Sequence, residues 1–269
     1  MSKSCPDEYP VTLYLNEQEL LTIQLSRVDW EDWATGYLFT EGIIDSPSDL
    51  KTLLIDDFDF RGKIWVDLVR GNAGSILKRR RHLTAGCGKG VTFQSISDVK
   101  KIKKVAFGRS ATLGYLQQKM REFSKLTPLY HQTGGMHGAC LIDLDGGMIV
   151  REDIGRHNAV DKVIGYAVRN GLPPQNLILM TTGRISYEML SKAARFGIGI
   201  IASRTAATCQ AIELAQFLQV EIVGYIRGQM ATVYTSCNRI IDDEKSRLFI
   251  HNKQPSVCPS DHNAIDLLP

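Results

Sequence analysis

Apolar and polar residues alternate over the first part of the chain, as they do in strands that face a core on one side. In VTLYLNEQELLTIQLS, residues 11–26, the alternation is interrupted at Asn16 and Glu17, which predicts two antiparallel strands joined by a turn. WEDWATGYLFTEGII, residues 30–44, repeats its aromatic and apolar residues at helical spacing and predicts a short amphipathic helix. Two strand-like runs, LLIDDFDF and KIWVDLV, follow. Residues 1–75 are therefore predicted to form a small β-rich N-terminal domain.

The second half of the chain has a different pattern, in which apolar runs alternate with helical segments. ACLIDL and MIVRED predict a hairpin that turns at 145–147, and RHNAVDKVIGYAVRNG predicts a helix that ends at Asn170 and Gly171. LILMTT, IGIIAS and VEIVGYI predict three buried strands, separated by the helical segments SYEMLSKAARFG and TAATCQAIELAQFLQ. This pattern is typical of a sheet that is buried on both faces. Residues 109–250 are therefore predicted to form a three-layer α/β/α domain.

Two stretches lack such periodicity. Residues 76–108 carry several glycines and two basic clusters, at 78–82 and 100–104, and are predicted to connect the two domains. Residues 251–269 contain prolines and polar residues without a period and are predicted to form a flexible tail. Basic runs are usually solvated faces, and a formal net charge of +3 is too small to indicate nucleic-acid binding. No nucleic-acid partner is expected.

The composition is that of a protein with a sizeable core. Of the 269 residues, 43% are apolar, so the chain is expected to fold without disulfides. The six cysteines include no CxxC pair, and the N-terminus MSKSCPDEYP has no apolar signal-peptide segment. No window approaches the roughly 18 uninterrupted apolar residues of a spanning helix. These features predict a cytoplasmic protein that does not insert into the membrane.

An arginine closely follows each of the three predicted buried strands. These residues are Arg184, Arg204 and Arg227, and Arg156 opens the preceding helix. Because ligands of open α/β sheets bind beyond the carboxyl ends of the strands, the four guanidinium groups are predicted to face one crevice. Guanidinium groups bind phosphate oxygens bidentately, and helix N-termini add partial positive charge, so the expected ligand carries phosphate or pyrophosphate. The alternative is pairing of these arginines with the acidic residues Asp153, Asp161 and Glu188.

The segment GGMHGAC, residues 134–140, places His137 three residues before Cys140. A zinc-dependent nucleobase deaminase needs H-x-E followed by P-C-x-x-C. Ala139 stands where the glutamate would be and P-C-x-x-C is absent, so no metal site is predicted and a deaminase-like hydrolase is disfavoured. Cys140 and Cys209 are predicted to be buried core residues. The glycines beside His137 indicate close backbone approach, either by a ligand or by tight packing.

Cys87 lies between two glycines in TAGCGKGVTF, residues 84–93. The arginines at 79–81 and Lys89 would lower the pKa of its thiol, and the glycines would let the loop present the sulfur to a large partner. A mobile nucleophile or sulfur carrier fits these features. An exposed thiol without a function is the alternative, because no base and no second cysteine is adjacent in the sequence.

Several long segments together resemble the FdhD family of formate dehydrogenase accessory sulfur carriers. They are TGYLFTEGII, GGMHGACLI, REDIGRHNAVDKVIGYA, TTGRISYEMLSKAA and VGYIRGQMATVYT, and the resemblance extends from about Val11 to Arg239. It implies a homodimer whose larger domain has a cytidine-deaminase-like fold without the zinc site. It also implies that the segment after the last parallel strand binds a cofactor, namely Tyr225, Ile226, Arg227, Gly228, Gln229 and Met230.

The same resemblance implies a reaction. Family members accept sulfane sulfur from a cysteine desulfurase as a persulfide. They deliver it to the molybdenum bis(molybdopterin guanine dinucleotide) cofactor, bound as a substrate, before this cofactor enters formate dehydrogenase. Cys87 matches the first cysteine of the family's C-G-x-C loop motif, and Gly90 stands at the position of the second.

The sequence therefore predicts a sulfurtransferase in which Cys87 carries the sulfur and the cations at the strand ends bind the phosphates of the cofactor. Besides residues 225–230, the residues expected to bind the cofactor are His137, Arg156, His157, Arg184 and Arg204. The expected partners are a cysteine desulfurase, a formate dehydrogenase and a second copy of the chain. A chaperone that binds the cofactor without moving sulfur is the alternative.

Overall fold

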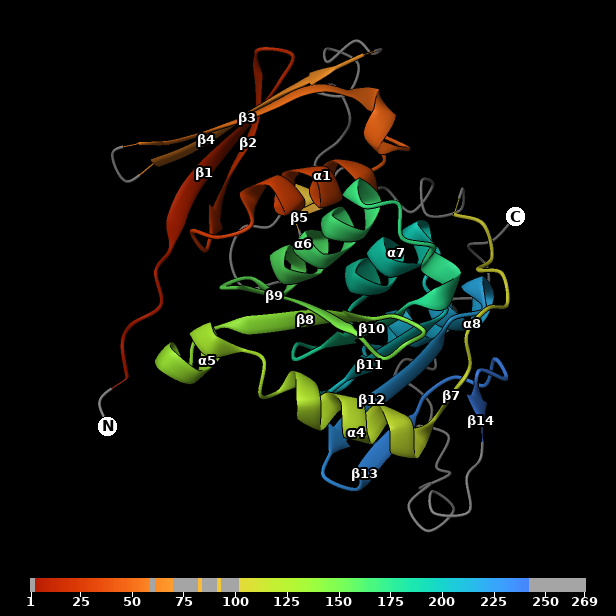
Figure 1. The fold of residues 1–269 in the computed structure, drawn as a ribbon. Helices are drawn as coiled ribbons and strands as arrows, with labels where there is room; N and C mark the ends of the chain where they lie inside the picture. Colours follow the sequence, from red (N-terminus) through yellow and green to blue (C-terminus); the bar gives the residue numbers. More distant parts are fainter. Residues whose placement is uncertain (1–2, 59–60, 70–81, 84–90, 93–101, 242–269) are drawn as a thin grey trace.

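The computed structural model describes residues 3–58, 61–69, 82–83, 91–92 and 102–241. Cys87, the predicted tail and most of the predicted connector lie outside these residues, and the domain boundaries stay predictions. The described chain forms two larger sheets with helices packed between and around them (Figure 1), which confirms the mixed α/β class. No helix in this part of the chain has the length and apolarity to cross a membrane.

The N-terminal sheet has four strands in the order β2-β1-β4-β3. They are β1 Tyr9–Leu15, β2 Gln18–Leu25, β3 Leu50–Phe58 and β4 Arg61–Leu68. The turn between β1 and β2 lies at Asn16 and Glu17, with φ of 46° and 67°, so the predicted hairpin is confirmed. β1 pairs in parallel with β4, and a 3-10 helix, Pro47–Asp49, leads into β3. Because alternate residues of β1 and β4 are buried, one face of this sheet is apolar.

Helix α1, Trp30–Thr40, covers the apolar face. It begins after Asp29, whose φ of 55° lies in the left-handed region. It ends just before Gly42, which has a φ of 71° and lies near the end of the segment 30–44 that predicts the helix. Trp33 and Leu38 are fully buried in the N-terminal core.

Helix α1 also packs against α6, Arg156–Arg169, which belongs to the second half of the chain. A Cβ atom added to Gly36 would lie far inside van der Waals contact with the carbonyl oxygen of Asp161. A Cβ atom added to Gly165 would overlap the carbonyl oxygen of Asp32 in the same way. The two glycines therefore allow the backbones of α1 and α6 to touch where the helices meet.

The second sheet has six strands in the order β13-β12-β11-β10-β8-β9. They are β8 His137–Ile142, β9 Met148–Asp153, β10 Ile178–Thr181, β11 Ile200–Ser203, β12 Glu221–Arg227 and β13 Met230–Val233. β10, β11 and β12 are parallel, while β8, β9 and β13 pair in antiparallel fashion with their neighbours. The hairpin predicted at 145–147 and the three predicted buried strands are confirmed.

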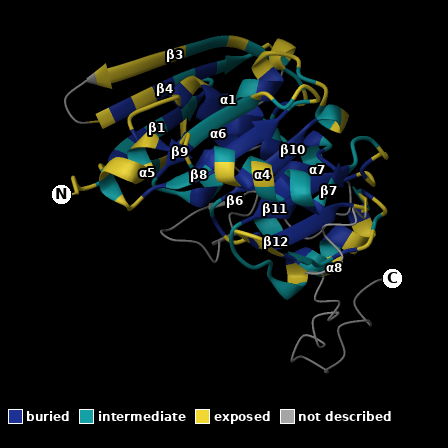
Figure 2. Ribbon diagram, turned by 60° about the horizontal axis from the view of Figure 1, so that its bottom comes forward, coloured by how far each residue is buried: buried dark blue, intermediate teal, exposed yellow. Residues whose placement is uncertain are grey.

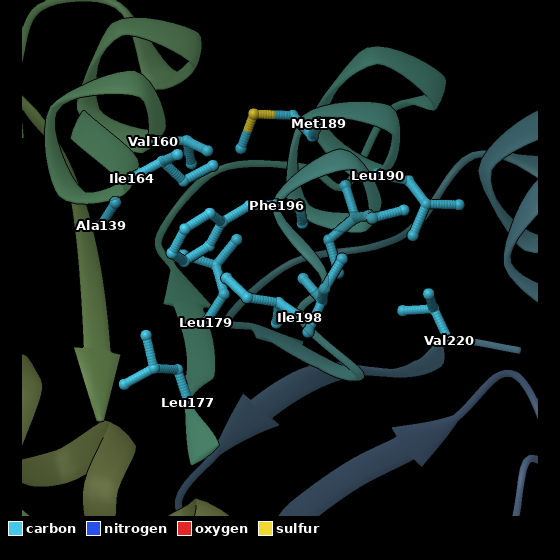
Figure 3. Close-up of a cluster of buried hydrophobic side chains, with 14 of the residues drawn as sticks. Ala139, Val160, Ile164, Leu177, Leu179, Met189, Leu190, Phe196, Ile198 and Val220 are labelled. Carbon is cyan, nitrogen blue, oxygen red and sulfur yellow. The ribbon is translucent and has the colours of Figure 1, made fainter. Parts of the chain in front are cut away.

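Helices α6, α7 (Tyr187–Phe196) and α8 (Cys209–Leu218) pack on one face of this sheet. Figure 3 shows side chains of α6 and α7, among them Ile164 and Leu190, in one apolar cluster with Leu179 of β10. α7 and α8 lie on the same face because the chain moves stepwise in one direction from β10 to β12 through parallel crossovers of constant hand. The connecting segment before β10 includes the 3-10 helix Pro174–Asn176.

The opposite face of the sheet is covered by helix α4, Leu113–Phe123, which was not predicted from the sequence. Helix α5, Pro128–Thr133, was missed as well. Figure 2 shows that the strands of the second sheet, which lie between the helices on its two faces, are mostly buried. Four short strands complete the described chain, in the pairs β7 Ala111–Thr112 with β14 Ile240–Ile241 and β5 His82–Leu83 with β6 Val91–Thr92.

Candidate functional site

The topology brings several polar segments to one edge of the second sheet. The parallel strands β10, β11 and β12 end at this edge, and β8, which runs the opposite way, begins there with His137. Helix α6 begins at Arg156, directly after β9 has ended at the same edge. The edge therefore carries the start of β8 and the N-termini of α6, α7 and α8. We call it the carboxyl edge, after the ends of the three parallel strands.

Two histidines lie at the carboxyl edge. The Nδ1 atom of His137 is 3.5 Å from Oγ1 of Thr182, and this hydroxyl accepts a hydrogen bond of 3.0 Å from the backbone N–H of Gly138. The Nε2 atom of His157 is 3.3 Å from Oγ of Ser186 and 3.3 Å from a carboxyl oxygen of Glu188. Each imidazole thus contacts a group from the segment that joins β10 to α7.

A buried arginine acts on both imidazoles. Arg156 is only 5% exposed, and its side chain lies so close to Gly183 that a Cβ atom there would overlap it. Burial, followed by the charge of Arg156, lowers the pKa of His157 to about 3 and also lowers the pKa of His137. Burial raises the pKa of the Glu188 carboxyl. Both imidazoles are therefore neutral at pH 7 and can serve as hydrogen-bonding groups.

Ser186, His157 and Glu188 resemble the components of a hydrolase triad, but they are arranged differently. In a triad, the acid orients the imidazole through one ring nitrogen while the other nitrogen faces the serine. Here the serine and the carboxyl group both lie 3.3 Å from the same nitrogen, Nε2. The Ser186 hydroxyl also caps helix α7 by accepting a hydrogen bond from Met189. The geometry therefore favours a binding role over nucleophilic catalysis by Ser186.

The loops that follow β10 and β11 have the same local structure. In each loop, the hydroxyl of the last strand residue accepts a hydrogen bond from the backbone N–H two residues later, at 3.1 Å after β10 and 3.0 Å after β11. A second hydroxyl, three residues further along the chain, caps the next helix. These hydroxyl residues are Thr181 and Ser186 in the first loop and Ser203 and Thr208 in the second. Ile185 and Ala207 form a parallel bridge, so the loops run side by side. Helices α7 and α8 therefore begin next to each other at the carboxyl edge.

The strand-end arginines occupy three kinds of position. Arg156 is buried, Arg204 is half-buried, and Arg184 and Arg227 are exposed. The Nε atom of Arg227 donates a hydrogen bond of 3.0 Å to the backbone oxygen of Arg204, which joins the ends of β11 and β12. The structure thus groups His137, Arg156 and His157 at one part of the edge, and Arg204 with Arg227 at another. Arg184 projects into solvent from the loop after β10.

The segment 225–230 includes the end of β12 and the turn into β13. Ile226 is buried in the core under α4, so only its backbone is available to a ligand. Tyr225 is 44% exposed and Met230 is 61% exposed. Gln117 of α4 donates a hydrogen bond of 2.7 Å to the backbone oxygen of Gln229, which anchors the turn. The exposed members of the segment are Tyr225, Arg227, Gly228, Gln229 and Met230.

Two of the acids proposed as alternative partners of the arginines form other ion pairs. Asp153 pairs with the buried Lys162 at 2.7 Å, and Asp161 pairs with Lys192 at 2.9 Å. Glu188 contacts His157, as described above, but this imidazole is neutral at pH 7 and the contact is not an ion pair. The sequence predicted Glu188 only as an alternative partner of an arginine, not as a neighbour of His157. Ser186 could have been found as a hydroxyl residue of the repeated strand-loop-helix pattern, whereas Thr182 has no hydroxyl counterpart in the second loop, where Arg204 stands.

The cysteines of the described residues differ in exposure. Cys140 is fully buried, as predicted, and burial raises the pKa of its thiol to about 12, so it is a poor nucleophile. Cys209 is half-buried at the first residue of α8, which corrects the prediction of a buried core cysteine. A helix N-terminus lies at the end of a loop, where less of the chain covers it. Cys5 is exposed.

His157 gives the stability of the protein a pH dependence that can be measured. The pKa of His157 is about 3 in the folded chain, against an ordinary value of 6.5. The unfolded chain therefore takes up a proton that the folded chain does not, and the free energy of unfolding falls as the pH decreases from 6.5 toward 3. The loss due to this group should reach about 1.4 kcal/mol per pH unit. Urea unfolding between pH 7 and pH 4.5 should therefore show a shallower decline for His157→Gln than for the unchanged protein. Equal slopes would contradict a buried, neutral His157.

Comparisons with known proteins agree with this architecture. A family model described as the FdhD/NarQ family matches residues 6–241. The chain is 35% identical over 243 residues to the sulfur carrier protein FdhD of Listeria innocua, covering 89% of this chain and 92% of the relative. It is 36% identical over 234 residues to the protein of the same name from Bacillus licheniformis, with coverage of 87% and 88%.

A solved structure is similar as well. The crystal structure of a formate dehydrogenase accessory protein from Desulfotalea psychrophila matches with a TM-score of 0.72 and 27% sequence identity. The match covers 90% of this chain and 92% of the other. The family model and the relatives each span most of the chain, including both sheets and the carboxyl edge. The chain therefore belongs to the FdhD/NarQ family.

Proposed function

We propose that this protein is a sulfur carrier for the maturation of formate dehydrogenase. In this proposal Cys87 takes sulfane sulfur from a cysteine desulfurase and delivers it to the molybdenum bis(molybdopterin guanine dinucleotide) cofactor. The names of the relatives support sulfur transfer and a formate dehydrogenase client. The observation that carries the cofactor part is the pairing of Arg204 with Arg227 at the carboxyl edge, where three helices begin.

The sulfur-accepting step requires only a thiolate at position 87. The Cys87 sulfur attacks the terminal sulfur of the desulfurase persulfide, a new S–S bond forms on Cys87, and the donor cysteine leaves as a thiolate. The basic residues near Cys87 in the sequence, Arg79–Arg81 and Lys89, support this role because nearby cations lower the pKa of a thiol. When the sulfur passes on to the cofactor, the S–S bond breaks and Cys87 leaves as a thiolate. The transferred atom is then at the sulfane level, and its conversion to a sulfido ligand would take two electrons from the molybdenum of the substrate or from an external reductant.

The carboxyl edge supplies the groups that a guanine dinucleotide requires. Pyrophosphate oxygens accept hydrogen bonds from guanidinium groups and from the free N–H groups of helix N-termini. Arg184, Arg204 and Arg227 lie at or near the surface and would supply the first kind of donor. The neutral His137 and His157 would supply hydrogen bonds without adding charge.

Nucleotide affinity tests this assignment. Arg227→Ala should weaken the binding of GDP by about 1.5 to 3 kcal/mol, the value of a hydrogen bond to a charged group. This corresponds to a loss of about ten-fold to 150-fold in a calorimetric titration. Arg61→Ala is the matched control, because Arg61 is an exposed arginine on β4 of the other sheet, and it should bind GDP as tightly as the unchanged protein. Equal affinity of both variants would remove Arg227 from the site.

The proposal also covers assembly, fold and location. We infer a homodimer in the cytoplasm, and a cytidine-deaminase-like, three-layer arrangement of the second sheet. Apolar clusters on both faces of that sheet support the three layers.

A further inference from the structure

Strand β3 forms an open edge of the N-terminal sheet. Among the described residues it pairs only with β4, so within this part of the chain the backbone groups on its other side have no strand partner. The centre of the strand is apolar, with the sequence Leu53-Leu54-Ile55. Leu54 is 63% exposed and Ile55 is 38% exposed, and Figure 2 shows exposed residues along this strand. Such an edge is a template for pairing with another strand.

An aromatic row leads across the outer face of the sheet to this edge. Tyr14 of β1 lies beside Trp65 of β4, and their rings stack with centroids 4.0 Å apart. Trp65 is in turn directly opposite Leu54 of β3. The row therefore continues from β1 to the open edge and stops at the exposed side chain of Leu54.

The charges of β3 are placed so that the strand complements itself. Lys51 lies near its start, and Asp56 and Asp57 lie near its end. In an antiparallel pair of two such strands each lysine faces the acidic end of the other strand, whereas a parallel pair would set like charges side by side. Asp57 also pairs with Arg27 at 2.8 Å, which holds its carboxylate on this part of the strand.

We propose that two copies of the chain associate through antiparallel pairing of their β3 strands, with the two-fold axis at Leu54. A two-fold axis perpendicular to a sheet must set one residue opposite itself, because the two members of a directly opposed pair either both direct their backbone groups to the partner or both direct them away. With the axis at Leu54, Leu53 faces the partner subunit's Ile55, and Thr52 faces the partner subunit's Asp56. Lys51, at the register shift between Leu50 and Thr52, lies near the partner subunit's Asp57. An axis at Leu53 would leave Lys51 opposite the partner subunit's Ile55.

The pairing joins two four-stranded sheets into one of eight strands and covers Leu54 and Ile55. It also makes the two aromatic rows continuous, because Leu54 of one copy lies against the partner subunit's Leu54. The N-terminal sheet lies on the other side of α1 and α6 from β10–β12 (Figure 1), so the dimer would leave both carboxyl edges open. The inference rests on the proposed homodimer and names its interface.

Light scattering after size-exclusion chromatography tests the interface. The unchanged protein should have twice the chain mass, and Leu54→Lys should raise the dissociation constant at least ten-fold, because two lysines would meet on the axis. Leu144→Lys is the matched control, since Leu144 is similarly exposed on the β8–β9 hairpin, and it should remain dimeric. A monomeric unchanged protein would overturn the homodimer together with this interface. A dimer that is unaffected by Leu54→Lys would overturn the interface alone.

A cross-link provides a second, positive test. Opposed residues of an antiparallel pair have Cα atoms about 4.5 to 5.5 Å apart, which suits a disulfide. Leu54→Cys should therefore form an intermolecular disulfide at position 54 on mild oxidation, identified by mass spectrometry of the linked peptide. Thr22→Cys on β2, at the far edge of the same sheet, should not form one. Failure of Leu54→Cys to cross-link in a dimeric sample would contradict the proposed register, and neither result bears on sulfur transfer by Cys87.

Discussion

Replacing Gly36 with alanine is expected to destabilise the protein by about 3 kcal/mol or more, since overpacking against a rigid backbone lies at the upper end of such costs. The new Cβ atom would overlap the carbonyl oxygen of Asp161 in α6, so the two helices must separate. The higher helix propensity of alanine offsets only about 1 kcal/mol of this cost. Urea unfolding followed by the fluorescence of Trp30 and Trp33, both in α1, measures the difference.

Gly171→Ala is the control for this prediction. Gly171 has a positive φ, 63°, which the helical Gly36 does not have, and nothing lies within 4 Å of an added Cβ atom. The free energy of unfolding of Gly171→Ala should therefore fall by only about 1 to 2 kcal/mol, which is what the left-handed conformation costs a residue with a side chain. If Gly36→Ala unfolds at the same urea concentration as the unchanged protein, the close helix crossing is wrong.

Replacing Cys87 with alanine is expected to abolish the maturation of formate dehydrogenase. Without this sulfur no persulfide can form at position 87, and Gly90 provides no second thiol in the loop. GDP affinity should stay nearly unchanged, because the proposed phosphate-binding groups lie at the carboxyl edge. Formate dehydrogenase activity in cells that lack their own sulfur carrier, complemented with the variant, measures the effect.

Cys5→Ala is the matched control, because Cys5 is an exposed free cysteine among the described residues. It should support maturation as well as the unchanged protein does. Normal maturation by Cys87→Ala would contradict sulfur transfer and would favour the alternative of a chaperone that only binds the cofactor. Loss of GDP binding in Cys87→Ala would instead place Cys87 among the residues that bind the nucleotide.

Much of the fold could be predicted from the periodicity of the sequence. The β1–β2 hairpin follows from strict alternation around Asn16 and Glu17, and the parallel strands β10–β12 follow from short apolar runs between helical segments. Helix α4 was overlooked although the sequence carries its signal, because its buried residues Leu113, Leu116, Met120 and Phe123 recur at helical spacing. The parallel pairing of β1 with β4 could not be predicted, because local patterns do not specify which distant strands become neighbours.

The candidate site was predictable where topology alone determines it. The ends of parallel strands share one edge, so the positions of Arg184, Arg204 and Arg227 follow from the strand order. The contact of His157 with Glu188 could not be predicted, since it depends on how α6 packs against α7. The burial of Ile226 was also missed, although alternation along β12 places it on the face opposite to its exposed neighbours Tyr225 and Arg227.

The central claim is that Cys87 carries sulfur, and its most direct test is the mass of the Cys87 peptide. The protein is incubated with a cysteine desulfurase and free cysteine, its thiols are alkylated, and the protein is then digested into peptides. A gain of about 32 Da, one sulfur atom, on the Cys87 peptide and not on the Cys5 peptide is the result that we predict. A Cys87 peptide of unchanged mass, while the desulfurase itself carries a persulfide, would contradict the account.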